Sequence, residues 1–261
     1  MPWSERQQAV LAAMGLRVWQ PPPAEAGAPR AAPVAAPAQA AAAPAAGPAP
    51  AAPKPAAPAL HAGAVAALDW PALREAVAVC RACGLCDSRT QTVFGVGHPQ
   101  ADWMVVGEAP GEQEDRKGEP FVGPAGQLLD AMLRALGVTR EAEGRAAERV
   151  YIANTLKCRP PRNRNPAPEE MAACEPFLVR QIQLVQPRII LAMGRFAVQA
   201  LLRSNEPIGK LRGRVHEYQG VPLVVTYHPA YLLRNLPDKA RAWEDLCLAA
   251  ATAEAERGAR A

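Results

Sequence analysis

Short apolar runs alternate with segments of helical periodicity from about residue 69 onward. Each run is continuous and rich in β-branched residues, which predicts strands buried on both faces; the four runs are residues 102–108, 149–154, 188–194 and 221–229. Apolar positions recur three and four apart in residues 125–137 and 169–186, which predicts helices. This alternation predicts an α/β fold, a three-layer α/β/α sandwich with a central, mainly parallel four-stranded sheet.

Polar residues and glycines follow each predicted strand. The four segments read "GEAPGEQED", "NTLKCRPP", "MGRFA" and "HPAYLLR". Because parallel α/β sheets bind their ligands beyond the carboxyl ends of the strands, we expect these segments to form a common site.

The first part of the chain has a different composition. Residues 1–20 carry apolar side chains at helical spacing, which predicts a short amphipathic helix. From residue 21 to residue 60, 32 of 40 residues are Ala or Pro, a composition that can neither build a core nor continue a helix. We therefore expect a disordered Ala/Pro-rich linker over residues 21–68 and one folded domain over residues 69–261.

Net charge says little about partners, because it is only +4. Basic residues do gather locally, which favours nucleic acid but equally fits a solvated surface; the two clusters are Lys157, Arg159, Arg162 and Arg164, and Lys210, Arg212 and Arg214.

The chain begins without a secretion signal, since "MPWSERQQAVLAAMG" has no basic start before an apolar run. The linker contains too much proline to cross a membrane. We expect a cytoplasmic protein, in which clustered thiols indicate metal binding or catalysis more often than disulfides.

Four cysteines form two separated pairs, Cys80 with Cys83 and Cys158 with Cys174. Structural zinc sites usually take two short knuckles, whereas the second pair brackets a long basic loop. That spacing fits a four-thiolate iron–sulfur cluster better than zinc, and ordinary buried cysteines are the third alternative. Cys86 competes with Cys83 as a ligand, and we expect Cys247 to be a core residue.

Several motifs in register resemble the family 4 uracil-DNA glycosylases, from about residue 80 to residue 243. They are "VFGVG", "VVGEAPGEQED", "GEPFVGPAGQLLD", "YIANTLKCRPPRNRNP" and "HPAYLLR". The resemblance implies a structural [4Fe–4S] cluster, held by Cys80, Cys83, Cys158 and Cys174. Cys86 falls at a position that this family does not use.

The same resemblance implies the roles of the site residues. Ala109 and Gly111 would lie against the sugar–base bond, where other glycosylase families carry aspartate and tyrosine. Phe121 would stack on the base, and the Asn154 amide would pair with O4 and N3–H of uracil. The implied catalytic residues are Glu108 and His228, the latter donating to uracil O2.

The implied activity is hydrolysis of the N-glycosidic bond of uracil in DNA, which leaves an abasic site for base excision repair. No redox cofactor or catalytic metal is expected. A leucine would wedge into the base stack and arginines would contact the backbone; the expected DNA contacts are Arg159, Arg162, Arg164, Leu232, Leu233 and Arg234.

Two alternatives come from other classes. One is a non-enzymatic iron–sulfur module that binds DNA. The other is the related covalent uracil-DNA binder, whose inserted basic loop carries a nucleophilic histidine. The second is disfavoured, because this chain has no histidine between His98 and His216 and keeps Cys158.

The N-terminal stretch "MGLRVWQ" resembles the peptide by which the clamp-loader psi subunit grips the chi subunit. The resemblance implies that residues 1–20 dock on chi and bring the protein to replication forks in the nucleoid of a bacterial cytoplasm. Packing on the chain's own catalytic domain, or no role, are the alternatives. We expect the protein itself to be a monomer.

Overall fold

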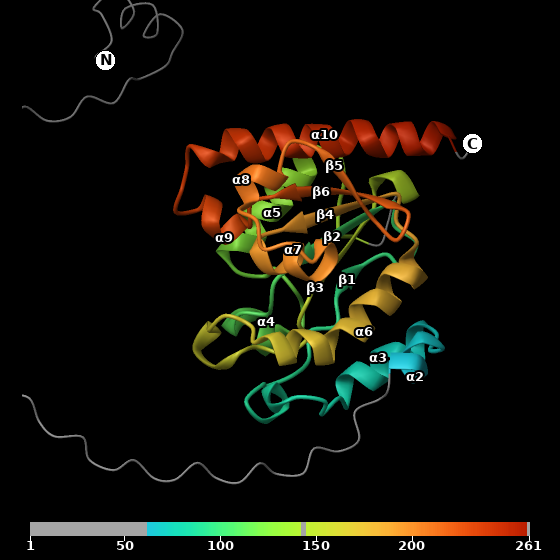
Figure 1. Ribbon diagram of the computed structural model, residues 1–261, viewed down its shortest axis with the longest axis vertical. Coiled ribbons are helices and arrows are strands. Elements are labelled where there is room, and N and C mark those ends of the chain that lie inside the picture. The colour runs from blue at the N-terminus through green and yellow to red at the C-terminus, as the bar shows by residue number, and fades with distance from the viewer. Residues whose placement is uncertain (1–61, 142–144, 260–261) are drawn as a thin grey trace, which may run out of the picture. The chain divides into compact units, whose positions relative to one another are not determined.

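The structure is a computed structural model and describes residues 62–141 and 145–259. A six-stranded sheet runs through this part of the chain, with helices on both faces (Figure 1). The strand order is β1-β3-β2-β4-β6-β5. The strands are β1 Val96–Gly97, β2 Trp103–Gly107, β3 Val150–Asn154, β4 Ile189–Met193, β5 Val215–Tyr218 and β6 Val221–Thr226.

The four predicted strands form the centre of this sheet, and all their pairings are parallel, as predicted. Alternate side chains of β2 face opposite helix layers. Met104 and Val106 pack with α6 (Pro168–Val185) and α7 (Arg195–Leu202). Val105 packs with α5 (Pro124–Ala135) and α10 (Asp238–Ala259) on the other face. The three-layer prediction is therefore confirmed.

The sheet has two strands more than the four predicted. β1 pairs with β3 and β5 pairs with β6, both antiparallel and both at the edges. β1 has only two residues, and β5 alternates exposed with half-buried positions. Neither contains the continuous apolar run by which the buried strands were recognised, so the sequence pattern missed both.

Helix α6 carries the clearest start signal. It begins at Pro168, whose fixed φ suits the first helical position, and Glu169 and Glu170 favour its positive end. The Glu170 carboxylate accepts from the backbone N–H of Ala167 at 2.8 Å. The shorter helices are α2 Ala62–Ala66, α3 Trp70–Ala78, α4 Glu112–Lys117, α8 Ile208–Leu211 and α9 Pro229–Leu232, with 3-10 turns at Gly84–Asp87, Ala146–Glu148 and Pro161–Asn163.

The folded part starts before the predicted boundary at residue 69. Val65 in α2 is buried, and Leu68 packs against the same apolar cluster. Residues 62–68 thus belong to the domain, which corrects the end of the predicted linker. The predicted helix over residues 1–20 and the rest of the linker lie outside the described residues.

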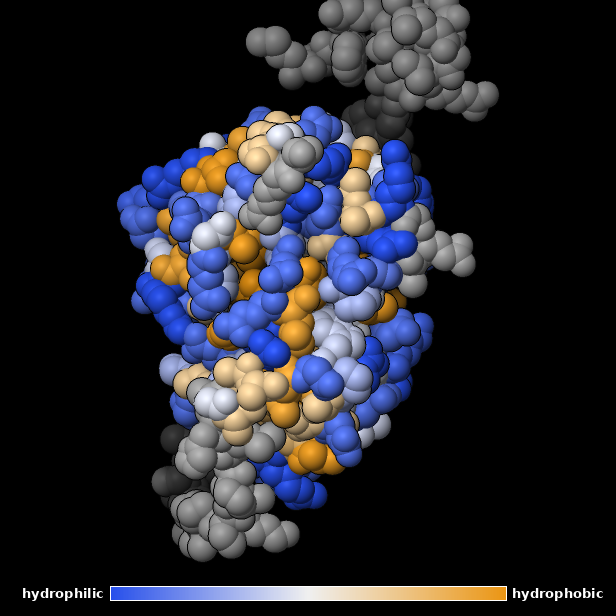
Figure 2. Space-filling model, turned by 90° about the vertical axis from the view of Figure 1, so that its right-hand side faces the viewer, coloured by the Kyte–Doolittle hydropathy of each residue, from blue (hydrophilic) through white to orange (hydrophobic). Residues whose placement is uncertain are grey.

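One face of the molecule is largely hydrophilic (Figure 2). On the face in Figure 2, apolar side chains emerge in a narrow vertical band between hydrophilic ones. None of the described helices combines the length and apolar character needed to cross a membrane. One predicted basic cluster is partly structural, because Arg212 pairs with the buried Asp245 at 3.0 Å and with Glu244 at 2.9 Å.

Candidate functional site

A small cavity at the carboxyl ends of the central strands gathers all the predicted catalytic and uracil-binding residues. Its volume is about 200 Å³. The lining residues come from the loop after β2 and α4, from the segment before α5 and its first turn, from the end of β3 and the loop after it, and from the loop after β6 and α9. The lining residues are Glu108, Ala109, Pro110, Gly111, Glu114, Phe121, Ala125, Asn154, Pro160, Asn163, Arg164, His228 and Ala230.

Asn154 brings an unsatisfied acceptor to this cavity. It is the last residue of β3, is paired in register with Gly107 of β2, and is only 3% exposed. Its side-chain Oδ1 is buried without a hydrogen-bond partner. Leaving a buried polar atom unpaired costs about 1–3 kcal/mol. A ligand N–H in the cavity would remove this cost.

Phe121 is held over the cavity in an unusual backbone conformation, with φ of 54°. Its ring stacks on the imidazole of His228, with centroids 5.3 Å apart and planes 26° apart. Two glycines make room for it. A Cβ on Gly126 would lie 1.7 Å from the Phe121 carbonyl oxygen, and one on Gly107 would lie 2.6 Å from the Phe121 ring. Sequence reasoning did not single out Gly126, although it stands inside a quoted motif.

His228 is positioned as a neutral donor. It precedes α9, and its Nδ1 accepts the backbone N–H of Ala230 at 3.1 Å. That bond assigns the proton of the neutral ring to Nε2. Burial, with a smaller effect of the nearby Arg234 charge, lowers the pKa of His228 to about 4. At neutral pH the ring therefore offers an uncharged Nε2–H.

Glu108 has a carboxyl group whose pKa lies near neutral pH. Burial raises its pKa to about 7, against a smaller lowering by Arg195. Its backbone carbonyl accepts from the Thr155 hydroxyl at 2.5 Å and from the Leu156 N–H at 3.1 Å. These bonds tie the loop after β2 to the loop after β3. Glu108 can hold or release a proton at the edge of the cavity.

Glu114 is a lining residue that sequence reasoning did not single out. Its carboxylate accepts the backbone N–H groups of Gly111, Val122 and Gly123 at 3.0–3.2 Å. It thereby joins the loop that carries Gly111 to the turn that carries Phe121. An acidic residue three positions after a helix-capping glycine was the available signal.

The predicted DNA-contacting arginines surround the cavity unequally. Arg164 lines it but pairs with Glu170 at 2.5 Å. Arg159 donates to Asn163 at 2.7 Å, and Arg162 is exposed. Lys157, grouped with them in sequence, is fully buried and does not belong to this surface.

The two candidate wedge leucines differ in exposure. Leu232 is 1% exposed because α9 turns it toward the interior, so the prediction that it contacts DNA is wrong. Leu233 is 42% exposed, and Arg234 beside it is exposed as well. Leu233 alone remains available as the wedge.

The four predicted cysteine ligands share one apolar cluster between the N-terminal helices and α6. Cys80 and Cys83 reach it from the turn after α3, Cys158 from the loop after β3, and Cys174 from α6. Burial, with smaller contributions from Cys158 and Cys80 and against a lowering by Lys157, raises the pKa of the Cys174 thiol to about 12. The thiols are therefore near enough to act on one another electrostatically.

Donors surround these sulfurs. Arg89 donates to the Cys158 sulfur at 3.0 Å, and the Lys157 backbone N–H lies 3.3 Å from the Cys174 sulfur. Such donors stabilise thiolate ligands. No group of three or more His, Cys, Asp or Glu in residues 62–141 and 145–259 is arranged around a single ion. Four thiols with cationic and N–H donors fit, by donor chemistry, a cluster of several irons.

The other two cysteines stand apart. Cys86 directs its thiol to Asp87 at 3.7 Å, although it also raises the pKa of the Cys83 thiol. Cys247 is exposed, so the expectation that it belongs to the core is wrong. It follows the buried Leu246 and lies off the stripe of α10 that faces the sheet.

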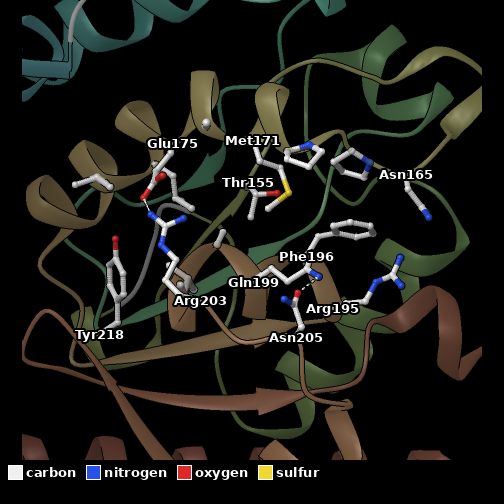
Figure 3. Close-up of a pocket in the computed structure, with 17 residues that line it drawn as sticks. Thr155, Asn165, Met171, Glu175, Arg195, Phe196, Gln199, Arg203, Asn205 and Tyr218 are labelled. Atoms are coloured by element: carbon white, nitrogen blue, oxygen red, sulfur yellow. Dashed lines mark hydrogen bonds and ion pairs between the residues drawn. The ribbon is translucent and has the colours of Figure 1, made fainter.

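A larger cavity of about 540 Å³ lies between α6 and α7 (Figure 3). Two pairs of its polar side chains satisfy each other: Arg203 pairs with Glu175, and Gln199 donates to Asn205 at 2.7 Å. None of the residues with an implied catalytic or base-reading role lines it. The smaller cavity, with its unpaired acceptor, is the better candidate site.

Fold and site together define an α/β protein with a small, partly polar cavity at the carboxyl ends of its central parallel strands. Comparison with known families is consistent with this. The sequence model of the "Uracil DNA glycosylase superfamily" matches residues 94–247, and the chain belongs to that superfamily. The match covers the whole sheet after residue 94 and leaves Cys80 and Cys83 outside.

Individual curated relatives show which members of the superfamily the chain is similar to. A Type-4 uracil-DNA glycosylase of Archaeoglobus fulgidus is 44% identical over 162 residues, 59% of this chain and 78% of the relative. One from Pyrobaculum aerophilum is 41% identical over 191 residues, 69% and 93% of the two chains. A Type-5 uracil-DNA glycosylase of Thermus thermophilus is 35% identical over 118 residues, 42% and 53% of the two chains. The similarity to the Type-4 enzymes is both higher and longer.

Proposed function

We propose that this protein is a uracil-DNA glycosylase, which hydrolyses the bond between uracil and deoxyribose in DNA and leaves an abasic site. The observation that carries the proposal is the buried, unpaired Oδ1 of Asn154 beside Phe121 and His228. The Type-4 relatives, which carry this activity in their names, support the same conclusion.

The Asn154 amide provides the base specificity. Its Oδ1 would accept uracil N3–H, and its NH₂ group would donate to O4. Cytosine presents the opposite pattern, an acceptor at N3 and a donor at the exocyclic amine. The stacking ring of Phe121 requires only a flat partner. Recognition of uracil against cytosine therefore depends on the fixed orientation of one amide.

The base must leave the DNA stack to enter a cavity of about 200 Å³. Extrusion costs a few kcal/mol, and least at mispairs such as U·G. The exposed Leu233 would fill the space left in the stack, with Arg234 on the backbone. Arg159, Arg162 and Arg164 would contact phosphates from the other side of the cavity.

Uracil leaves as an anion, and the sugar becomes an oxocarbenium-like cation. The neutral His228 Nε2–H would donate to uracil O2, where negative charge grows, and such a donor is worth about 3–4 kcal/mol. Glu108, once ionised, would stabilise the sugar cation and orient the attacking water. Ala109 and Gly111 have small side chains that leave room for the sugar, and no carboxylate stands at position 109.

Cys80, Cys83, Cys158 and Cys174 would hold a [4Fe–4S] cluster. When bound, the cluster supplies a structural cross-link rather than a reaction step. Its ligands join the segment after α3 to the basic loop after β3 and to α6. The proposed DNA-contacting loop, residues 159–165, would thus be anchored at both of its ends.

The proposed partner is uracil-containing DNA. Docking of residues 1–20 on the clamp-loader chi subunit, the monomeric state and a place in the nucleoid stay predictions. A pull-down of chi with residues 1–25, compared with a Trp19→Ala peptide, tests the docking. Chi retained equally by both peptides, or by neither, contradicts it.

The activity is tested on a duplex with one U·G pair, incubated with excess enzyme and then treated with alkali. Strand cleavage at the uracil, with none at the same position of a C·G duplex, is the expected result. Binding without cleavage would instead favour the non-enzymatic DNA-binding module. A protein–DNA band that survives denaturant would favour the covalent binder.

A further inference from the structure

Lys157 is a buried cation behind the wall of the small cavity. Its side chain is 1% exposed. The ammonium donates to the backbone carbonyl of Asn154 at 2.8 Å and to Oε1 of Gln181 at 2.6 Å. Both acceptors are uncharged, and both are held by the fold, since Asn154 ends β3 and Gln181 belongs to α6. Burying an ammonium in this way is costly, and the arrangement calls for a specific role.

The orientation of Gln181 is fixed by its other contacts. Its Nε2 donates to the Phe94 carbonyl at 2.9 Å and lies 3.1 Å from the Tyr151 hydroxyl. Because a backbone carbonyl can only accept, the amide nitrogen must face Phe94, and the amide oxygen must face Lys157. Gln181 belongs to α6 and is fully buried. The Lys157 ammonium therefore donates to an amide oxygen whose orientation is fixed.

The second acceptor belongs to the residue that reads the base. Asn154 lines the cavity, has a buried and unpaired Oδ1, and gives its backbone carbonyl to Lys157. The chain then continues through Lys157 directly to Cys158. Lys157 does not line the cavity, and its ammonium contacts a lining residue through the Asn154 carbonyl.

We propose that Lys157 is a positioning residue for base recognition: its ammonium, braced by Gln181, fixes the Asn154 backbone and thereby the orientation of the amide that selects uracil. This inference rests on the proposed function. It gives a reason for a charged donor at the Asn154 carbonyl, since such a donor holds a carbonyl more firmly than a neutral one. It also distinguishes Lys157 from the arginines that follow it, which contact solvent.

A double-mutant cycle tests the inference. Lys157→Met keeps the length and the apolar stem of the side chain and removes the donor. Single-turnover uracil excision is measured for the wild type, Lys157→Met, Asn154→Ala and the double variant, all with matched iron content. Loss of a charged hydrogen bond should lower the wild-type rate roughly 10- to 100-fold. In the Asn154→Ala background, the same change should cost less than about twofold, because the amide it positions is gone.

Equal losses in both backgrounds would overturn the inference, since a general structural role does not depend on the Asn154 side chain. If Lys157→Met does not fold, Gln181→Met is used in the same cycle, with the same expectation and the same contrary result. Lys239→Met, at an exposed position of α10, is the control and should leave the rate unchanged. A wild type that excises no uracil would defeat the proposed function instead, so the two failures are distinguishable.

Discussion

At the scale of single residues, the site depends on polar groups whose protonation and orientation are set by burial. Asn154 has one unpaired acceptor, His228 is kept neutral, and Glu108 is held near the middle of its titration at neutral pH. Each of these properties arises because the side chain is buried away from water. Neighbouring backbone donors or charges then modify the effect of burial. The pocket is thus prepared for a ligand that supplies the missing hydrogen-bond partner.

Asn154→Asp is expected to lower uracil excision at least 100-fold. The substitution replaces the amide donor to O4 with an acceptor, which adds a repulsion to a lost hydrogen bond of about 1–3 kcal/mol. Single-turnover kinetics at a U·G pair measure the change. Asn205→Asp, in the larger cavity, is the control. Unchanged kinetics for Asn154→Asp would mean that this amide does not read the base.

Glu108 should shape the pH profile of the reaction. Because burial raises its pKa to about 7, it becomes the active anion only as the pH rises through about 7. The single-turnover rate is expected to rise over this range in the wild type. Glu108→Gln should be slow and should lack this rise. A rise near pH 7 that persists in the variant would assign it to another group.

His228 should make the stability of the folded protein depend on pH. Its pKa falls from an ordinary 6.5 to about 4, so the unfolded chain binds a proton more readily between these values. Stability should therefore decrease as the pH falls from 6.5 to 4, by up to about 3 kcal/mol from this residue. The stability of His228→Gln should fall less over that range. Denaturant unfolding of both proteins at several pH values measures the difference, and parallel curves would contradict it.

At the scale of elements, turns and helix starts position the site. The segment before α5 carries Phe121 in a left-handed conformation, and the close approach of Gly126 in the first turn of α5 leaves no space for a side chain. Glu114 joins this segment to the loop after β2 through three backbone N–H groups. Recognition of the base is therefore a property of connected loops as much as of individual side chains.

Gly126→Ala should disturb this arrangement. The added Cβ would lie 1.7 Å from the Phe121 carbonyl, so either α5 or the turn must move. Overpacking of this kind costs about 1–3 kcal/mol. We expect a lower melting temperature together with slower excision. Gly63→Ala, where nothing lies within 4 Å of the new Cβ, is the control. A Gly126→Ala protein with wild-type stability and rate would show that the contact is not needed.

The central elements could be predicted from sequence because buried strands and amphipathic helices have strong patterns. The edge strands β1 and β5 could not, since pairing at an edge requires only a few residues and no continuous apolar run. The direction in which a side chain points could not be predicted from the sequence either. Leu232 and Leu233 are neighbours in one motif, yet the helical turn of α9 buries the first and exposes the second. The motifs located the pocket, whereas Glu114, Gly126 and the buried state of Lys157 depend on tertiary contacts.

At the scale of the whole molecule, the pocket lies at the carboxyl ends of the central strands. The four cysteines lie in the apolar cluster next to the basic loop after β3. Cys158 and Cys174 bracket the basic loop, and Cys80 and Cys83 connect it to the N-terminal helices. Loss of the proposed cluster should therefore affect folding before it affects chemistry.

Cys158→Ala is expected to lose visible colour and solubility together, while anaerobically purified wild type is brown with broad visible absorbance. Cys247→Ala, at an exposed position outside the cluster, is the control and should keep the colour. Iron and sulfide analysis measures the outcome. A colourless, zinc-loaded and fully active wild type would contradict the cluster assignment.

The central claim is that the pocket excises uracil and rejects cytosine. The most direct measurement is mass spectrometry of the free bases released from a duplex that carries one U·G pair and one C·G pair at equivalent positions. The account predicts stoichiometric uracil with excess enzyme and no free cytosine. Release of cytosine at a similar rate, or no release of uracil from DNA that the protein demonstrably binds, would contradict it.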